Sequence, residues 1–75
     1  MADKMIDLKG LLCPMPVVKM AKEIKTIEVG QVIEAQASDP GVLADIPAWC
    51  KSTGNEMLSM EKKEKIFVFQ VRRLV

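Results

Sequence analysis

The chain has 75 residues, of which 49% are hydrophobic and 28% are charged, and its formal net charge is only +1. We expect a single domain over residues 1–75, because this length leaves no room for a second core and the composition is that of a folded chain. The near-neutral charge excludes a broad electrostatic attraction to nucleic acid or to anionic membranes, so partners should be recognised locally.

The cysteine content and the first residues narrow the class further. Two cysteines and no histidine cannot supply a zinc site of the usual Cys/His kind, so we expect no metal. Cys13 and Cys50 form no CxxC motif, and reduced thiols are therefore expected. Asp3, Lys4 and Asp7 lie where a signal peptide would need apolar residues, and no long apolar run follows. These features predict a cytoplasmic protein that does not enter a membrane.

The first half of the chain predicts a strand, a helix and a second strand. Residues 5–8 alternate weakly between apolar and polar, which predicts a short strand, and Gly10 then permits a turn. Apolar residues recur at helical spacing over residues 17–27 with charged residues largely between them, which predicts an amphipathic helix. After Gly30, residues 31–37 place isoleucine and alanine on one side and polar residues on the other, as a strand packed on one face requires.

The middle of the chain predicts a second helix with a complicated start. Ser38 to Gly41 combines N-cap side chains with a proline suited to a first helical turn. Pro47 inside a helix would cost about 3 kcal/mol. We therefore expect a turn over residues 40–44 and a main helix beginning at about Asp45 or Ile46, with Asp45 as its cap.

The last third predicts a hairpin that completes an α/β domain. Gly54 ends the second helix, and residues 56–60 and 66–72 read as strands joined by a charged loop over residues 62–65. The order β-α-β-α-β-β favours a two-layer sandwich with both helices on one sheet face. Residues 66–69 are all apolar, so part of the last strand could form an exposed patch on the other face and dock a partner.

The segment Gly10-Leu11-Leu12-Cys13-Pro14-Met15-Pro16 places a thiol where a strand ends and a helix begins. Pro14 disfavours helical angles at Cys13 and suits a first helical position, which predicts Cys13 as the N-cap. Free amides such as that of Met15 and the helix dipole would then lower the thiol pKa modestly below about 8.5. The same position also suits a small apolar residue in a capping turn, and local chemistry favours neither reading.

The other candidate residues have simpler interpretations. Cys50 shares an expected core stripe with Ile46 and Trp49, so we assign it to packing. Arg72 and Arg73 are candidate contacts for an acidic partner, although a solvated hairpin explains them more simply. No Ser/His/Asp set, phosphate loop or Cys/His dyad can be assembled, which leaves one exposed thiol as the candidate reactive group.

The Cys13 segment resembles the G-L-x-C-P-x-P signature, with its CPxP motif, of the TusA/SirA-like sulfur carrier (sulfurtransferase TusA) family. Four further segments resemble the family in the same order, namely residues 30–31, 39–41, 45–48 and 53–56. The resemblance implies a fold like the C-terminal domain of translation initiation factor 3, with a mixed four-stranded sheet under two helices and only the last strand antiparallel.

The same resemblance implies persulfide relay by Cys13, a sulfurtransferase activity that requires no cofactor. The sulfur donor would be a cysteine desulfurase or a rhodanese-type protein, and the acceptor a thiol of a DsrE-like or other protein. The supporting motif residues would be Gly10, Leu11, Pro14, Met15 and Pro16. Members that act in tRNA thiolation tend to carry an acidic residue at the position of Met15 and a basic one at that of Leu12. Transfer to tRNA modification, to molybdenum-cofactor assembly and to sulfur oxidation therefore all stay open.

Two other hypotheses belong to different classes. The first is a non-catalytic regulatory module in which Cys13 is structural and the open sheet face or the Arg72-Arg73 pair binds protein or RNA, although direct nucleic-acid binding should be weak at this charge. The second is a redox protein that pairs Cys13 with Cys50, which would require their Cα atoms to lie within about 7 Å.

Overall fold

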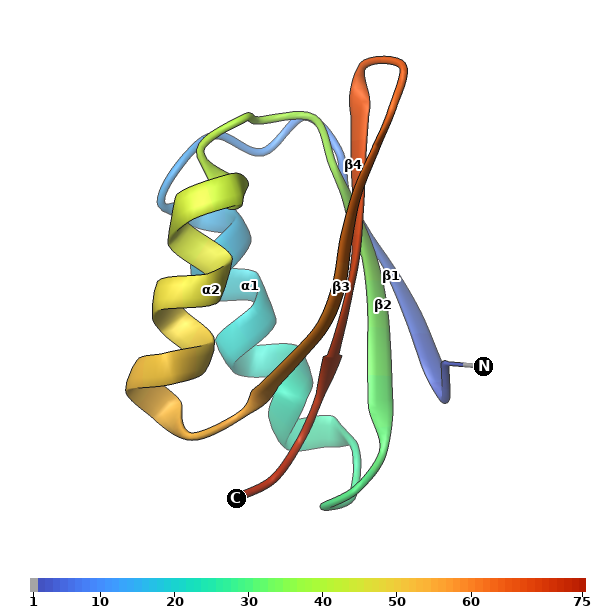
Figure 1. Cartoon of the computed structure of the whole chain (residues 1–75), viewed down its shortest axis with the longest axis vertical. Helices are drawn as coiled ribbons and strands as arrows, with labels where there is room; N and C mark the ends of the chain where they lie inside the picture. The colour runs from blue at the N-terminus through green and yellow to red at the C-terminus, as the bar shows by residue number, and fades with distance from the viewer. Residues whose placement is uncertain (1) are drawn as a thin grey trace.

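The computed structural model describes residues 2–75, which form four strands, two α-helices and one 3₁₀-helix. In chain order these are β1 (Lys4–Leu8), α1 (Met15–Glu23), η1 (Ile24–Thr26), β2 (Val32–Ala37), α2 (Val42–Thr53), β3 (Glu56–Lys63) and β4 (Ile66–Arg72). The predicted order β-α-β-α-β-β is confirmed. Figure 1 shows α1 and α2 packed as one layer against the sheet.

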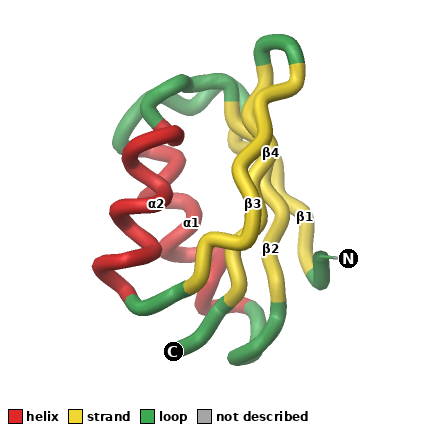
Figure 2. Tube along the Cα trace, viewed as in Figure 1, coloured by secondary structure: helices red, strands yellow, loops and turns green. Residues whose placement is uncertain are grey.

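The sheet has the strand order β1-β2-β4-β3. β1 and β2 are parallel, whereas β4 runs antiparallel to both of its neighbours, β2 and β3. β4 is therefore the strand that runs against the other three, which confirms the mixed sheet expected from the resemblance. Both helices lie on one side of this sheet, as Figure 2 shows, and the two-layer α/β prediction is confirmed.

The core lies between the helices and the inner face of the two central strands. Ala35 of β2 faces Phe69 of β4, and both side chains are fully buried. A small residue opposite a phenyl ring leaves room for helical side chains above the sheet, where Met20 of α1 and Ile46 of α2 are also fully buried. Close packing of this kind is the main source of stability in a domain of this size.

α2 begins three or four residues earlier than the sequence predicts. The helix starts at Val42 with Gly41 at the N-cap, and Pro47 lies inside it. The predicted start at Asp45 or Ile46 is wrong because the backbone amides of Val42 and Leu43 already bond to the carbonyls of residues 39 and 40. Val42 is buried in the core, and this packing offsets the energetic cost of Pro47 inside the helix. The predicted end at Gly54, which has a φ of 85°, is confirmed.

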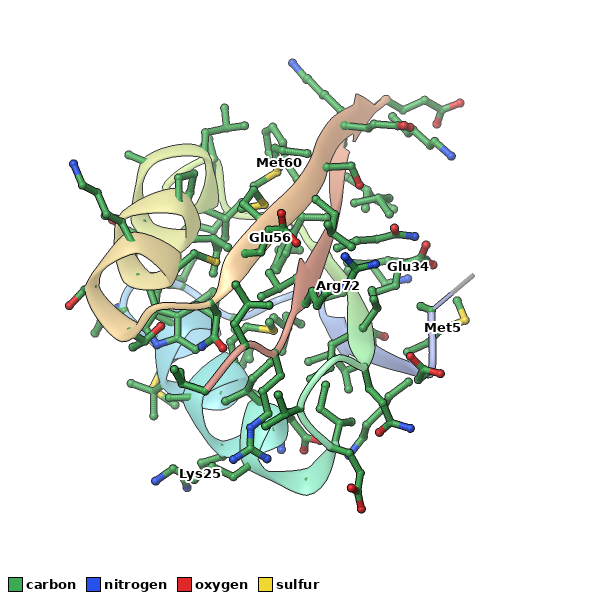
Figure 3. The ribbon with its side chains drawn as sticks, turned by 60° about the horizontal axis from the view of Figure 1, so that its bottom comes forward. Met5, Lys25, Glu34, Glu56, Met60 and Arg72 are labelled. Carbon is green, nitrogen blue, oxygen red and sulfur yellow. The ribbon has the colours of Figure 1, made fainter. Side chains whose placement is uncertain are left out.

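The outer face of the sheet is mainly polar. On this face Gln70 donates a hydrogen bond to Glu34 at 2.9 Å. Arg72 pairs with Glu56 at 3.4 Å, and Figure 3 labels these two side chains. The two phenylalanines of β4 are buried toward the helices, and only the half-buried Ile66 and Val68 add large apolar side chains to the outer face from this strand. The expected apolar patch on β4 is thus confined to two partly covered residues.

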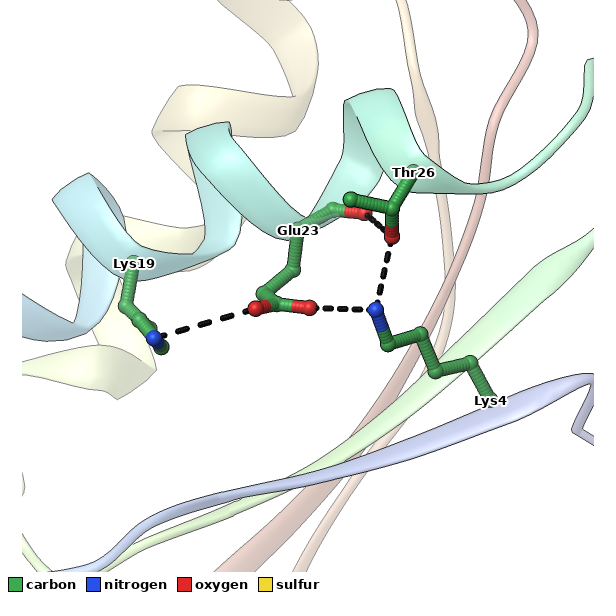
Figure 4. Close-up of polar contacts among 4 residues, drawn as sticks. All are labelled: Lys4, Lys19, Glu23 and Thr26. Carbon is green, nitrogen blue, oxygen red and sulfur yellow. Dashed lines mark hydrogen bonds and ion pairs between the residues drawn. The ribbon is translucent and has the colours of Figure 1, made fainter.

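An ion pair ties β1 to the end of α1 (Figure 4). Lys4 Nζ lies 2.5 Å from Glu23 Oε2, and the same ammonium donates a hydrogen bond to Thr26 Oγ1 at 2.7 Å. Lys19 lies one helical turn before Glu23 and approaches its other carboxylate oxygen at 3.7 Å. The Lys4 ammonium is the main reason that the pKa of Glu23 falls below its ordinary value.

Candidate functional site

The loops that follow β1 and β2 meet at one end of the sheet, where both strands finish. The two strands are parallel, and Leu8 lies opposite Ala37, so the chain leaves both strands at the same end. The Gly10 amide donates a hydrogen bond to Ser38 Oγ at 3.0 Å, and Gly10 has a φ of 86°, a conformation that glycine adopts without strain. Figure 1 shows both loops crossing the same end of the molecule.

Cys13 lies in the first of these loops. It donates two hydrogen bonds to carboxylates, one in the second loop and one in α2. Its backbone amide donates to Asp39 Oδ2 at 2.6 Å, and its thiol donates to Asp45 Oδ2 at 2.6 Å. Asp39 is itself held in place, because its other oxygen accepts the Gly41 amide at 3.0 Å. The thiol remains exposed to solvent. This end of the fold therefore presents a nucleophile beside two negative charges.

The N-cap of α1 is Pro14, and the prediction that Cys13 caps the helix is wrong by one residue. The Met15 amide donates to the Leu12 carbonyl at 2.8 Å, so a turn closes around Cys13 before the helix begins. The Cys13–Pro14 peptide is cis. Pro16, in the first helical turn, is buried and anchors the start of the helix on the core.

The pKa of Cys13 is raised, and the prediction of a lowered value is wrong. The hydrogen bond to Asp45 is the largest cause, followed by desolvation and by the charges of Asp45 and Asp39. The start of α1 offers little to oppose them: Pro14 and Pro16 have no N–H, and the Met15 amide is already bonded to Leu12. The two nearby carboxylates therefore favour the protonated thiol over the thiolate.

Cys50 occupies a different environment and confirms the prediction of a packing role. Its side chain is 2% exposed and belongs to the core cluster that includes Ile46. Burial raises the pKa of Cys50 to about 11. Both cysteines are free thiols. The redox hypothesis, which pairs the two cysteines, receives no support. The Cys13 thiol is exposed and hydrogen-bonded to Asp45, whereas the Cys50 thiol is enclosed in the core.

The remaining motif residues flank Cys13 in the chain, whereas the two arginines lie elsewhere in the fold. Leu11 packs partly against the core, and Leu12 and Met15 are 73% and 48% exposed. Arg72 lies opposite Val32 at the start of β2, and the Arg73 amide donates to the Gln31 carbonyl, whereas the Cys13 loop lies where β1 and β2 end. Arg73 donates hydrogen bonds to two backbone carbonyls, those of residues 27 and 75, while Arg72 pairs with a carboxylate of β3.

Sequence reasoning missed Asp39 and Asp45 as members of the site. It assigned Asp39 to the side chains that cap a first helical turn and Asp45 to the cap of the main helix, and neither role requires contact with Cys13. The available signal was that both residues fall in segments that match the family in order, residues 39–41 and 45–48. Their contact with Cys13 depends on the parallel pairing of β1 with β2, which local patterns do not encode.

A cavity of about 340 Å³ lies beside the C-terminal ends of the two helices, whereas Cys13 precedes the start of α1. Its lining includes Trp49, Lys25 and Arg73, and Cys13 is not among the lining residues. Across residues 2–75, no helix has the length and hydropathy needed to span a bilayer. The same part of the chain contains no group of three or more acidic or cysteine side chains placed to hold a metal ion.

The fold and the site define a small α/β domain with one exposed cysteine in a Cys-Pro-x-Pro loop. Comparison with protein families gives a match to the family described as Sulfurtransferase TusA over residues 4–73. The chain therefore belongs to the TusA family, and the resemblance seen in the Cys13 segment is confirmed.

Individual relatives agree with this assignment. The chain is 34% identical over 71 residues to the sulfur carrier protein TusA of Allochromatium vinosum, covering 95% of this chain and 93% of that protein. It is 46% identical over 68 residues to YrkF, which is described as a putative sulfur carrier protein of Bacillus subtilis (strain 168). The matched residues make up 91% of this chain but only 37% of YrkF. The crystal structure of a SirA-like protein from Desulfitobacterium hafniense has the same fold, with a TM-score of 0.80 at 19% identity over 96% of this chain and 99% of that one. A sulfur carrier role is thus supported by homology.

Proposed function

We propose that Cys13 carries sulfur as a persulfide, taking it from a protein persulfide and passing it to the thiol of an acceptor protein. The observation that carries this proposal is the difference between the two cysteines. Cys13 is an exposed thiol in the loop that holds the family motif, whereas Cys50 is 2% exposed in the core. Only the first can meet a partner's sulfur without unfolding.

The chemistry is thiolate exchange and needs no further reagent. The Cys13 thiolate attacks the terminal sulfur of a donor cysteine persulfide, a new S–S bond forms on Cys13, and the donor leaves as a thiolate. The acceptor thiolate then attacks the carried sulfur in the same way and releases Cys13. The transferred atom keeps its oxidation state throughout, so no external oxidant, reductant or metal enters the balance.

The surroundings of Cys13 suit a group that reacts only inside a complex. Its amide is held by Asp39, which fixes the loop, and its thiol proton is shared with Asp45, which keeps the free protein in the less reactive thiol form. We propose a cysteine desulfurase or a rhodanese-type protein as the sulfur donor, a DsrE-like or other thiol protein as the acceptor, and the reducing cytoplasm as the compartment.

The test is intact-mass spectrometry after incubation with cysteine and a cysteine desulfurase. The wild type and Cys50→Ala should gain one sulfur atom, and Cys13→Ser should gain none. Alanine is the better control at the buried position, because a serine hydroxyl there would lack a hydrogen-bond partner. The added mass must disappear on treatment with a thiol reductant, since a sulfinic acid adds nearly the same mass and resists ordinary thiols.

The outcomes separate the proposal from its alternative. A reductant-labile gain that depends on Cys13 supports the carrier. Failure to load from both an active desulfurase and a rhodanese-type donor would overturn it and leave the non-catalytic binding module. RNA binding measured by fluorescence over a range of salt concentrations would then be the next assay.

A further inference from the structure

Asp45 is the side chain in direct contact with the proposed reacting sulfur. Its Oδ2 accepts the thiol hydrogen bond of Cys13 at 2.6 Å, and it comes from the first turn of α2, so a regular helix fixes its position. A carboxylate so close to the sulfur adds negative charge to any complex formed there. A partner that brings its own sulfur to Cys13 must therefore be compatible with the negative charge of Asp45.

The local electrostatic environment of the Cys13 thiol is negative. The charges that act on the thiol are those of Asp45 and Asp39, both negative. Leu12 and Met15, which flank the Cys13-Pro14 pair in the chain, are exposed and apolar. A partner that fits this surface therefore combines an apolar contact with a positive charge placed beside its own reacting sulfur.

We propose that Asp45 is a specificity-determining residue of sulfur transfer, selecting protein partners that carry a lysine or arginine next to the reacting cysteine. Such a cation would pair with the Asp45 carboxylate and release Cys13 from the hydrogen bond that keeps it protonated. A partner with an acidic group at the same place would be repelled. This inference rests on the proposed role of Cys13 and names the kind of partner that the same site accepts.

Small disulfides of different charge test the selection without any protein partner. In each reaction the Cys13 thiolate attacks one sulfur of the probe, the probe's S–S bond breaks, and a small thiolate leaves and takes up a proton. The probes are cystamine, which is cationic, and 3,3′-dithiodipropionate, which is anionic. Intact mass gives the second-order rate of mixed-disulfide formation at Cys13 for each.

The decisive quantity is the cystamine rate divided by the dithiodipropionate rate, compared between proteins. Differences in leaving group between the probes and changes in the Cys13 thiolate fraction both cancel in this comparison. The rate ratio should fall about fivefold to tenfold in Asp45→Asn, as expected for losing one charge a few ångströms from the probe's own charge. Asp45→Glu should restore most of it. Glu28→Gln, which removes an exposed carboxylate from the segment that precedes β2, should leave it unchanged.

A second measurement does not depend on any variant. For the wild type, raising NaCl from about 20 mM to about 500 mM should reduce the same rate ratio, because exposed charges are screened at high salt. A rate ratio that stays the same in Asp45→Asn would overturn the inference, and a ratio that does not respond to salt would also count against it, because it would show no charge preference at the site. The probes need no persulfide, so this result is independent of sulfur loading. A chain that loads sulfur on Cys13 but shows no charge preference keeps the proposed function and loses this inference.

Discussion

The Cys13 thiol donates a hydrogen bond to Asp45 Oδ2 at 2.6 Å, which joins the first loop of the chain to the first turn of α2. This contact reverses the effect expected from a cysteine at a helix start, since the carboxylate raises the pKa that a helix dipole would lower. A raised thiol pKa disfavours oxidation of Cys13, because the thiolate is the form that oxidants attack.

Replacing Asp45 with asparagine should lower the pKa of Cys13. The variant removes the charge and the hydrogen bond that stabilise the protonated thiol, so the thiolate forms at lower pH. The rate of alkylation by iodoacetamide, a neutral reagent, should rise severalfold at pH 7, and its pH profile should move to lower pH. Glu28→Gln serves as the control and should follow the wild-type profile. A profile that is unchanged in Asp45→Asn would contradict the assigned cause of the raised pKa.

Native alkylation should distinguish the two cysteines. Cys13 is exposed, whereas Cys50 is buried and has a pKa of about 11. Labelling of Cys50 requires local or global opening, so Cys13 should react at least about a hundredfold faster at pH 7. Peptide mass mapping after short exposure to iodoacetamide measures both rates. In urea-unfolded protein the two rates should become similar. Comparable rates in folded protein would contradict the assignment of Cys13 as the exposed thiol and Cys50 as the buried one.

The Lys4–Glu23 ion pair should make stability depend on acid pH. The pKa of Glu23 is lowered in the folded state, so its contribution is present above the unfolded value of about 4.3 and is lost as pH falls through the folded value. Glu23→Gln should lower the free energy of unfolding at pH 7 by up to about 1 kcal/mol, the range for partly exposed pairs.

Urea unfolding at neutral and at acid pH measures this effect. The difference between the wild type and Glu23→Gln should shrink once Glu23 is protonated in both folded and unfolded states. Glu28→Gln should show little difference at either pH. If Glu23→Gln lowers the free energy of unfolding as much in acid as at pH 7, then packing, and not charge, connects β1 to the end of α1.

Pro47→Ala should stabilise the domain. Pro47 lies inside α2 with an exposed side chain, so the substitution loses little packing and restores the amide that can bond to the Leu43 carbonyl. We expect the free energy of unfolding to rise by about 1–3 kcal/mol, less any gain in flexibility of the unfolded chain. Thermal and urea unfolding test this, and a clear loss of stability would show that the proline ring makes necessary contacts.

Much of the fold follows from patterns along the chain. The strand over residues 31–37 and the helix before it were predictable because side-chain spacing of two or about 3.6 residues directly reports which face is buried. The helix boundaries were less predictable. Pro47 weighs against an early start of α2 in any local argument, yet the buried contacts of Val42 and Ile46 outweigh its cost.

By itself the sequence determined the order of the elements, the packing role of Cys50 and the identity of the candidate reactive thiol, because each depends on residue spacing or on a short contiguous motif. Only the tertiary structure decided the environment of that thiol. Cys13 and Asp45 are 32 positions apart and meet because β1 pairs in parallel with β2, which brings the loop after each strand to one end of the sheet. The strength of electrostatic interactions depends on distance in space, so the sign of the Cys13 pKa shift was fixed by the fold and not by the motif.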